Sequence, residues 1–74
     1  MKKVCPNGDV VYINSDGKLH RTDGPAVKYA NGYNGWYIDG EELADMKNGK
    51  VTIRTKGELP SLIKQSIAME KLKV

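Results

Sequence analysis

The chain has 74 residues, of which 39% are hydrophobic and 28% charged, with one cysteine and no phenylalanine. This composition is typical of one small folded domain, and it excludes a disordered chain, an intramolecular disulfide and a membrane span of about 18 apolar residues. Residues 1–46 hold five Lys/Arg and seven Asp/Glu, and residues 47–74 hold seven and two, so net charges of −2 and +5 make up the total of +3. We expect a soluble cytoplasmic domain whose C-terminal third is basic.

Seven dipeptides that end in glycine divide the chain at nearly regular intervals. Their glycines, which lie 9, 7, 8, 8, 9 and 8 residues apart, are Gly8, Gly17, Gly24, Gly32, Gly40, Gly49 and Gly57. Six of the dipeptides are Asn-Gly or Asp-Gly, which favour tight hairpins because both central residues of the turn need a positive φ angle. A turn about every eight residues leaves room for strands of about five. The spacing predicts an antiparallel β-meander of about five to six short strands over residues 1–56.

The segments between the turns have the composition of strands. Residues 9–14 (DVVYIN) are β-branched and aromatic, and residues 26–30 place Val27 and Tyr29 on one face. Alternation also places Trp36 and Tyr37 on opposite faces, so we expect one of these two side chains to be exposed.

Two later segments give different expectations. Residues 50–55 (KVTIRT) alternate cleanly, which predicts that Val51 and Ile53 face inward. Residues 41–47 (EELADMK) have helical propensity instead, and we expect a short turn of helix or a wide loop there.

The hydrophobic period becomes helical near the C-terminus. Pro60 and Ser61 form a helix-start signal, with proline suited to the first turn and serine to a cap. The apolar residues expected on the inward side of the helix are Leu59, Leu62, Ile63, Ile67 and Met69. The sequence therefore predicts a single α+β domain over residues 1–74, in which one helix over about 60–72 packs on a face of the meander.

The segment HRTDGPA at 20–26, followed by YANGYNGWYIDGE, resembles a short repeat of small phage and bacterial proteins. That repeat has the form L-H-R-x-D-G-P-A, an Asn-Gly or Asp-Gly turn, a Trp-Tyr pair and another Asn/Asp-Gly, and it is similar in layout to MORN-type repeats built from β-hairpins. The resemblance covers about residues 17–42, and Glu41-Glu42-Leu43 replaces the histidine-arginine pair of a second unit. It implies a hairpin scaffold and a phage-encoded accessory protein that binds a host or defence protein, with no catalytic residues to transfer.

The stretch LHRTDGPAV at 19–27 contains a histidine, an arginine, an aspartate and a Gly-Pro pair within nine residues. Arg21 and Asp23 share one face of an extended segment, so we expect them to pair at a structural corner. A catalytic pair of His20 and Asp23 would also need a nucleophile in a recognisable setting and an oxyanion donor. One histidine and one cysteine do not make a zinc site, and Cys5 is expected to be a partly buried, small apolar residue. We predict no enzyme, no metal site and no cofactor.

Three hypotheses for function remain. The first is a non-enzymatic protein-binding module that inhibits a host or anti-phage defence protein by steric occlusion, with anti-CRISPR-type action as one form, because exposed Tyr and Trp residues are favoured interface anchors. Its candidate partner-binding residues are His20, Arg21, Tyr33, Trp36, Tyr37, Glu41 and Glu42. The second is a nucleic-acid-binding module, with candidate phosphate contacts at Lys50, Arg54, Lys56, Lys64 and Lys71. The third is a self-assembling structural protein, in which the acidic loop of one copy meets the basic helix of another.

Overall fold

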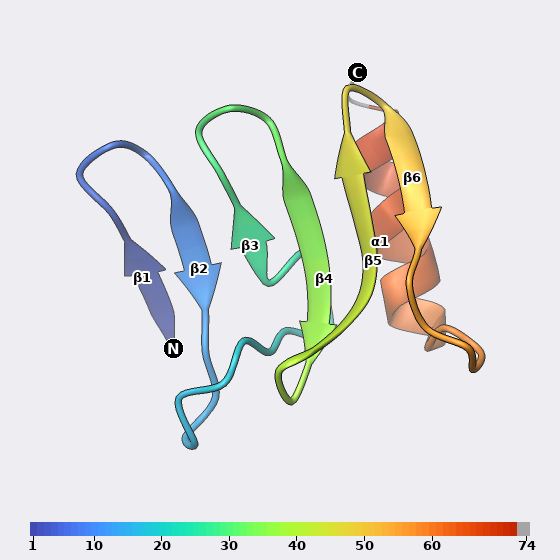
Figure 1. Cartoon of the computed structure of the whole chain (residues 1–74), viewed down its shortest axis with the longest axis horizontal. Helices are drawn as coiled ribbons and strands as arrows, with labels where there is room; N and C mark the ends of the chain where they lie inside the picture. The colour runs from blue at the N-terminus through green and yellow to red at the C-terminus, as the bar shows by residue number, and fades with distance from the viewer. Residues whose placement is uncertain (73–74) are drawn as a thin grey trace.

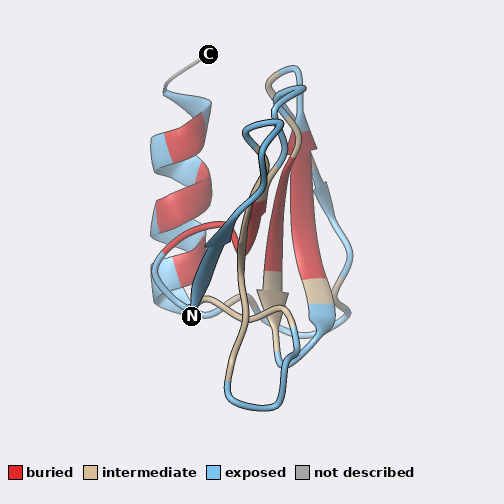
Figure 2. Ribbon diagram, turned by 90° about the vertical axis from the view of Figure 1, so that its left-hand side faces the viewer, coloured by how far each residue is buried: buried red, intermediate tan, exposed pale blue. Residues whose placement is uncertain are grey.

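The computed structural model describes residues 1–72 as one antiparallel sheet with a helix on one face (Figure 1). The strands are β1 (Lys2–Val4), β2 (Val10–Tyr12), β3 (Val27–Lys28), β4 (Asn34–Ile38), β5 (Glu41–Lys47) and β6 (Lys50–Ile53), and the helix is α1 (Ser61–Lys71). The strands pair in chain order from β1 to β6, and α1 lies to one side of the sheet (Figure 2). The predicted β-meander with one C-terminal helix is therefore confirmed.

Tight turns at positive φ join the longest strands. Asp39 and Gly40 have φ angles of 49° and 84°, and Asn48 and Gly49 have φ angles of 54° and 79°. Both pairs have the geometry that favours Asp-Gly and Asn-Gly in two-residue hairpins. Gly24 does not adopt a positive φ, and it lies in the long connection between β2 and β3.

That long connection contains a short hairpin of its own. Ile13 pairs with Leu19 in an isolated bridge across the Asp16-Gly17 turn. Leu19 then accepts a hydrogen bond from the backbone of Gly40 at 2.8 Å. The next residue, His20, donates its backbone N–H to the Tyr12 carbonyl of β2 at 3.0 Å. The connection is therefore hydrogen-bonded to β2 on one side and to the β4–β5 turn on the other.

The expectation for residues 41–47 is wrong, because they form β5, the longest strand. This strand pairs with β4 on one side and with β6 on the other. Two hydrogen-bond ladders outweigh helix propensities that differ by less than about 0.7 kcal/mol for each ordinary residue. The register also shifts, so that Trp36 lies opposite Ala44 while Tyr37 lies opposite Glu42, and Leu43 is the extra residue between them.

The main core lies between α1 and the C-terminal half of the sheet, where buried segments of the helix and strands face each other (Figure 2). Its members are Trp36, Leu43, Ala44, Met46, Ile63 and Ile67. Trp36 is fully buried, and its indole Nε1 donates a hydrogen bond to Ser66 Oγ at 2.8 Å. The single tryptophan therefore fastens β4 to α1 through both apolar contact and a satisfied polar group.

Several details of α1 differ from expectation. Pro60 rather than Ser61 occupies the N-cap position, and no side chain caps the helix there. Leu62 and Met69, which were expected to face inward, are 53% and 60% exposed. The sheet lies along a neighbouring stripe of the helix instead.

Two polar residues take the inward positions. Ser66 is buried and accepts the Trp36 hydrogen bond. Glu70 is also buried and accepts a hydrogen bond from Lys28 Nζ of β3 at 3.3 Å. Each polar group is stabilised at this position by its partner on the sheet, which is the condition for burying it at low cost.

Two residues at the sheet edges are more exposed than predicted. Ile53 is 51% exposed on β6, the last strand in the sheet order, whereas Val51 packs against the core as expected. Cys5 follows β1 at the opposite edge and is exposed rather than partly buried.

Candidate functional site

Three tyrosines gather on the sheet face that lies away from α1. Successive side chains of a strand point to opposite faces, and Trp36 points to the helix, so Gly35 and Tyr37 belong to the other face. Tyr33 precedes β4 on that same face, and the ring of Tyr29 stacks on it with centroids 5.5 Å apart and planes inclined by 25°. The Tyr29 side of this stack is the more open, with Tyr29 42% exposed.

Gly35 makes the close packing of these rings possible. A Cβ atom at this position would lie 2.8 Å from Val27 Cγ2, 2.9 Å from Tyr37 Cε1 and 3.3 Å from Tyr33 Cε1. The two rings and the valine therefore converge over a backbone that has no side chain. A glycine inside a strand is a known sign of such close approach, so Gly35 is a site residue that the sequence signalled and that we did not predict.

Charged side chains of β5, and of Arg54 directly after β6, lie beside the tyrosines. The Tyr33 hydroxyl donates a hydrogen bond to Glu42 Oε2 at 2.7 Å. Beside it, Asp45 accepts from Arg54 Nε at 2.9 Å and lies 2.8 Å from Arg54 Nη2, while Arg54 Nε also lies 4.0 Å from Glu42 Oε1. We call this set the tyrosine face, and its members are Tyr29, Tyr33, Gly35, Tyr37, Glu42, Asp45 and Arg54.

The surroundings of Tyr33 and Tyr37 favour the neutral form of these two phenols. Burial, followed by the hydrogen bond to Glu42, raises the pKa of Tyr33 well above its ordinary value. Burial and then the charge of Glu42 raise the pKa of Tyr37. The hydrogen bond to Asp45 raises the pKa of Arg54, so its guanidinium stays charged. The face therefore presents aromatic rings beside two carboxylates and one guanidinium, a group whose net charge is −1.

The structure brings together only part of the predicted partner-binding set. Tyr33, Tyr37 and Glu42 are in direct or near contact, whereas Glu41 is exposed at the start of β5, opposite Ile38. Trp36 is a correction, because a fully buried side chain that is bonded to the helix presents no surface to a partner. Of the two aromatic residues at the centre of β4, Tyr37 alone is available on the open face.

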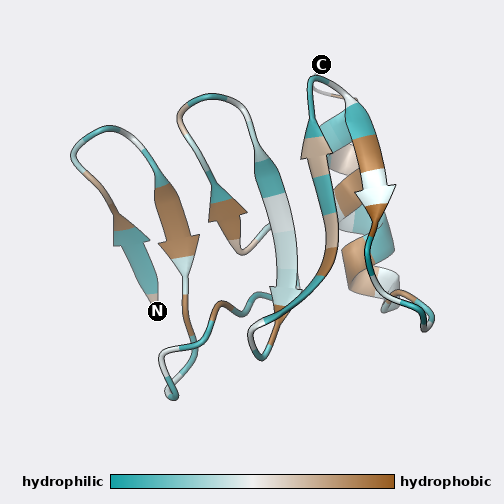
Figure 3. Ribbon diagram, viewed as in Figure 1, coloured by the Kyte–Doolittle hydropathy of each residue, from teal (hydrophilic) through white to brown (hydrophobic). Residues whose placement is uncertain are grey.

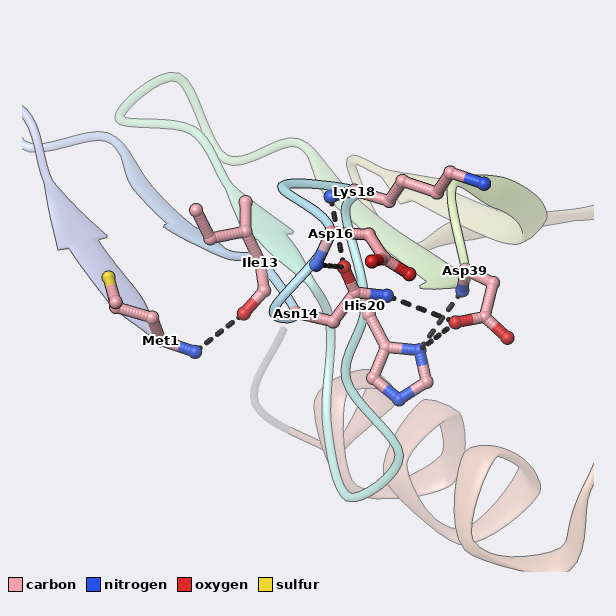
Figure 4. Close-up of polar contacts among 7 residues, drawn as sticks. All are labelled: Met1, Ile13, Asn14, Asp16, Lys18, His20 and Asp39. Atoms are coloured by element: carbon pink, nitrogen blue, oxygen red, sulfur yellow. Dashed lines mark hydrogen bonds and ion pairs between the residues drawn. The ribbon is translucent and has the colours of Figure 1, made fainter.

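His20 lies in a separate corner, where two turns meet (Figure 4). Its Nδ1 accepts a hydrogen bond from the Asp39 backbone N–H at 3.0 Å and lies 3.5 Å from Asp39 Oδ1. Asn14 completes the corner, since its Oδ1 accepts from the backbones of Asp16 and Lys18 while its Nδ2 donates to Asp39 Oδ1 at 3.0 Å. These bonds hold the Asp16-Gly17 and Asp39-Gly40 turns together, which is a structural role.

Arg21 is held between an aromatic ring and a glycine. Its guanidinium carbon lies 4.1 Å from the centroid of the Tyr12 ring, and a Cβ at Gly24 would lie 2.6 Å from that same carbon. Arg21 Nε donates to Asp23 Oδ1 at 2.9 Å and Nη1 donates to the Pro25 carbonyl at 3.2 Å. The predicted Arg21–Asp23 pair is present, and it lowers the pKa of Asp23.

The structure places the residues proposed for phosphate contact in two different settings. Arg54 belongs to the tyrosine face, where two carboxylates neutralise it. The other four are exposed, and they are Lys50, Lys56, Lys64 and Lys71. Over residues 1–72, no group of three or more His, Cys, Asp or Glu side chains is arranged to hold a metal ion. No helix in that range has the length and apolar character needed to cross a membrane.

Comparison with protein-family models, with curated proteins and with solved structures finds no match to this chain.

Proposed function

We propose that this chain is a non-enzymatic protein-binding module and that its tyrosine face docks against a partner protein. The observation that carries the proposal is the group of three tyrosines on the helix-free face, two of them stacked and one of those bonded to Glu42. Tyrosines held in this way lose little conformational freedom on binding, and their rings offer apolar area next to a hydroxyl group.

The partner is a host or anti-phage defence protein if the resemblance of residues 17–42 to small phage proteins holds. The module would then inhibit by covering a surface that its target needs, since the rings of the face are packed together and one of them is hydrogen-bonded to Glu42. Anti-CRISPR-type inhibition is one form of this action. The two carboxylates and the guanidinium would contribute mainly to specificity, because charged groups at an interface discriminate between partners more than they add affinity.

Affinity capture with matched variants tests the proposal. The immobilised protein should retain a stoichiometric partner from bacterial lysate, and Tyr29→Ala with Tyr37→Ala should reduce the yield at least tenfold, as expected when hot-spot residues are truncated. Leu62→Ala is the control, since it truncates a side chain that is 53% exposed on the helix. Equal capture by the tyrosine variant, with its fold verified by circular dichroism, would exclude the tyrosine face as the docking surface.

The four exposed lysines support nucleic-acid binding as a second candidate function. Electrostatic binding of this kind predicts a mobility shift whose affinity falls steeply as salt rises. Lys50→Glu with Lys64→Glu should abolish the shift. The absence of any shift at low salt would exclude this function.

A further inference from the structure

The backbone of β6 follows the alternation of a two-residue hairpin. The Asn48-Gly49 turn places Lys47 opposite Lys50, and in such a hairpin this closing pair is hydrogen-bonded in both directions. The next hydrogen-bonded residue of β6 is then Thr52, two positions along. Arg54 follows the same alternation, since its N–H donates to the Leu43 carbonyl of β5 at 2.8 Å.

The intervening residues, Val51 and Ile53, therefore direct their backbone N–H and C=O groups away from β5. β6 is the last strand of the sheet over residues 1–72, so these groups form an open edge. The Ile53 side chain is 51% exposed at this edge. Hydrophobic and hydrophilic residues alternate along β6 (Figure 3), as in a strand with one face toward the helix and the other toward solvent.

Positive charge borders the β6 edge on both faces of the sheet. Lys50 is exposed on the strand itself. On α1, Glu70 pairs with Lys28 of β3, which identifies the side of the helix that faces the N-terminal strands. Lys71 and Lys64 are exposed. At about 100° per residue they lie about 100° and about 120° around the helix from Glu70, on the side of the helix toward β6.

The charges decide between possible occupants of this edge. A second copy of β6 would place lysine and arginine side chains across from one another, which destabilises strand pairing. A nucleic acid would leave the outward N–H and C=O groups without hydrogen-bond partners and the exposed Ile53 side chain without an apolar contact. Residues 47–74 also contain no aromatic residue on which a base would stack. An extended polypeptide satisfies the backbone groups, and acidic side chains on it complement the lysines.

We infer that the β6 edge binds an extended, acidic segment of a partner protein as an added strand, with an apolar residue of that segment against Ile53. The inference concerns a different surface from the tyrosine face and does not depend on it. Backbone hydrogen bonds would supply the affinity, and the lysines would select acidic over basic segments.

Titration with a synthetic eight-residue peptide of alternating glutamate and valine tests the inference. Amide hydrogen exchange followed by nuclear magnetic resonance should show at least tenfold slower exchange at the outward N–H groups of Val51 and Ile53. The Thr52 N–H, which is already bonded to β5, should change much less. A peptide of alternating lysine and valine is the control, and it should leave all three amides unchanged.

Charge reversal provides a second measurement on the same complex. Lys50→Glu and Lys64→Glu should each weaken the binding of the acidic peptide about three- to fivefold, as expected for one exposed ion pair worth up to about 1 kcal/mol. Lys18→Glu, which makes the same charge change in the connection between β2 and β3, should have little effect. The inference is overturned if Val51 and Ile53 gain no protection, if the lysine peptide protects them equally, or if protection appears only at β1.

Discussion

Gly35→Ala directly tests the packing on which the tyrosine face depends. The added methyl group would lie 2.8 Å from Val27 Cγ2 and 2.9 Å from Tyr37 Cε1, both closer than ordinary contact. Val27 is 1% exposed, whereas the rings of Tyr33 and Tyr37 are partly exposed, so we expect the rings to move outward. Overpacking of this kind costs about 1–3 kcal/mol of folding stability.

Part of that cost is offset in the unfolded state. Replacing glycine by alanine removes backbone freedom from the unfolded chain and stabilises the fold by about 0.4–1 kcal/mol where the native backbone accepts alanine. Gly35 has no positive φ, so the offset applies there, and a net loss of about 1–2 kcal/mol follows. In a domain of this size, that loss lowers the melting temperature by roughly 4–16 °C.

Urea denaturation followed by tryptophan fluorescence measures the loss, because the single tryptophan is fully buried and becomes exposed on unfolding. Gly57→Ala is the matched control. Its added methyl group would meet nothing closer than Thr55 Oγ1 at 3.9 Å, and its φ is not positive, so this variant should be as stable as the parent or slightly more stable. Equal stability of the Gly35 and Gly57 variants would refute the proposed convergence of the rings over Gly35.

Three further predictions follow from individual contacts. Ser66→Ala leaves the buried Trp36 N–H without its acceptor, and it should lower the free energy of unfolding in urea by about 1–3 kcal/mol. Gly24→Ala places a methyl group 2.6 Å from the Arg21 guanidinium carbon, so the Arg21 Nε–H resonance should shift and lose its protection from solvent exchange. The raised pKa of Tyr33 means that the unfolded chain ionises first as pH rises past about 10, so stability should be constant below that pH and fall above it. Urea melts between about pH 8 and pH 11 should show this fall, and Tyr33→Phe should reduce it.

The turns and the strand order could be predicted because their causes are local. Asp39-Gly40 and Asn48-Gly49 adopt positive φ at both positions, and this conformation follows from the residue types themselves. Asp23-Gly24 has the same residue types but no positive φ at Gly24, and the Arg21 guanidinium lies where a side chain at Gly24 would be. The residue types therefore identify where the chain turns, but at Gly24 they do not determine how it turns.

The tyrosine face could be predicted only in part, since Glu42 and Asp45 come from β5 and Arg54 directly follows β6. Residues 41–47 favour a helix in isolation, and as a helix they would not place Glu42 beside Tyr33 or Asp45 beside Arg54. Alternation identified Tyr37 as a candidate, but it could not decide between Tyr37 and Trp36. That choice depends on which face α1 covers, and α1 is positioned by contacts between residues far apart in the sequence, such as the Trp36–Ser66 hydrogen bond.

The stretch LHRTDGPAV shows why a segment with several charged and titratable residues need not be a functional site. Arg21 contacts the Tyr12 ring, Asp23 and the Pro25 carbonyl, and Gly24 leaves the space that its guanidinium occupies. A guanidinium that is stacked and bonded on several sides must give up these contacts before it can bind a partner, which makes such binding costly. Tyr29 is different, because its exposed ring makes no hydrogen bond that binding would have to break among the contacts described, and it already stacks on Tyr33. Arg21, which helps to make this stretch recognisable in the sequence, is therefore bonded within the fold, whereas the exposed ring of Tyr29 lies on the opposite side of the sheet from Trp36.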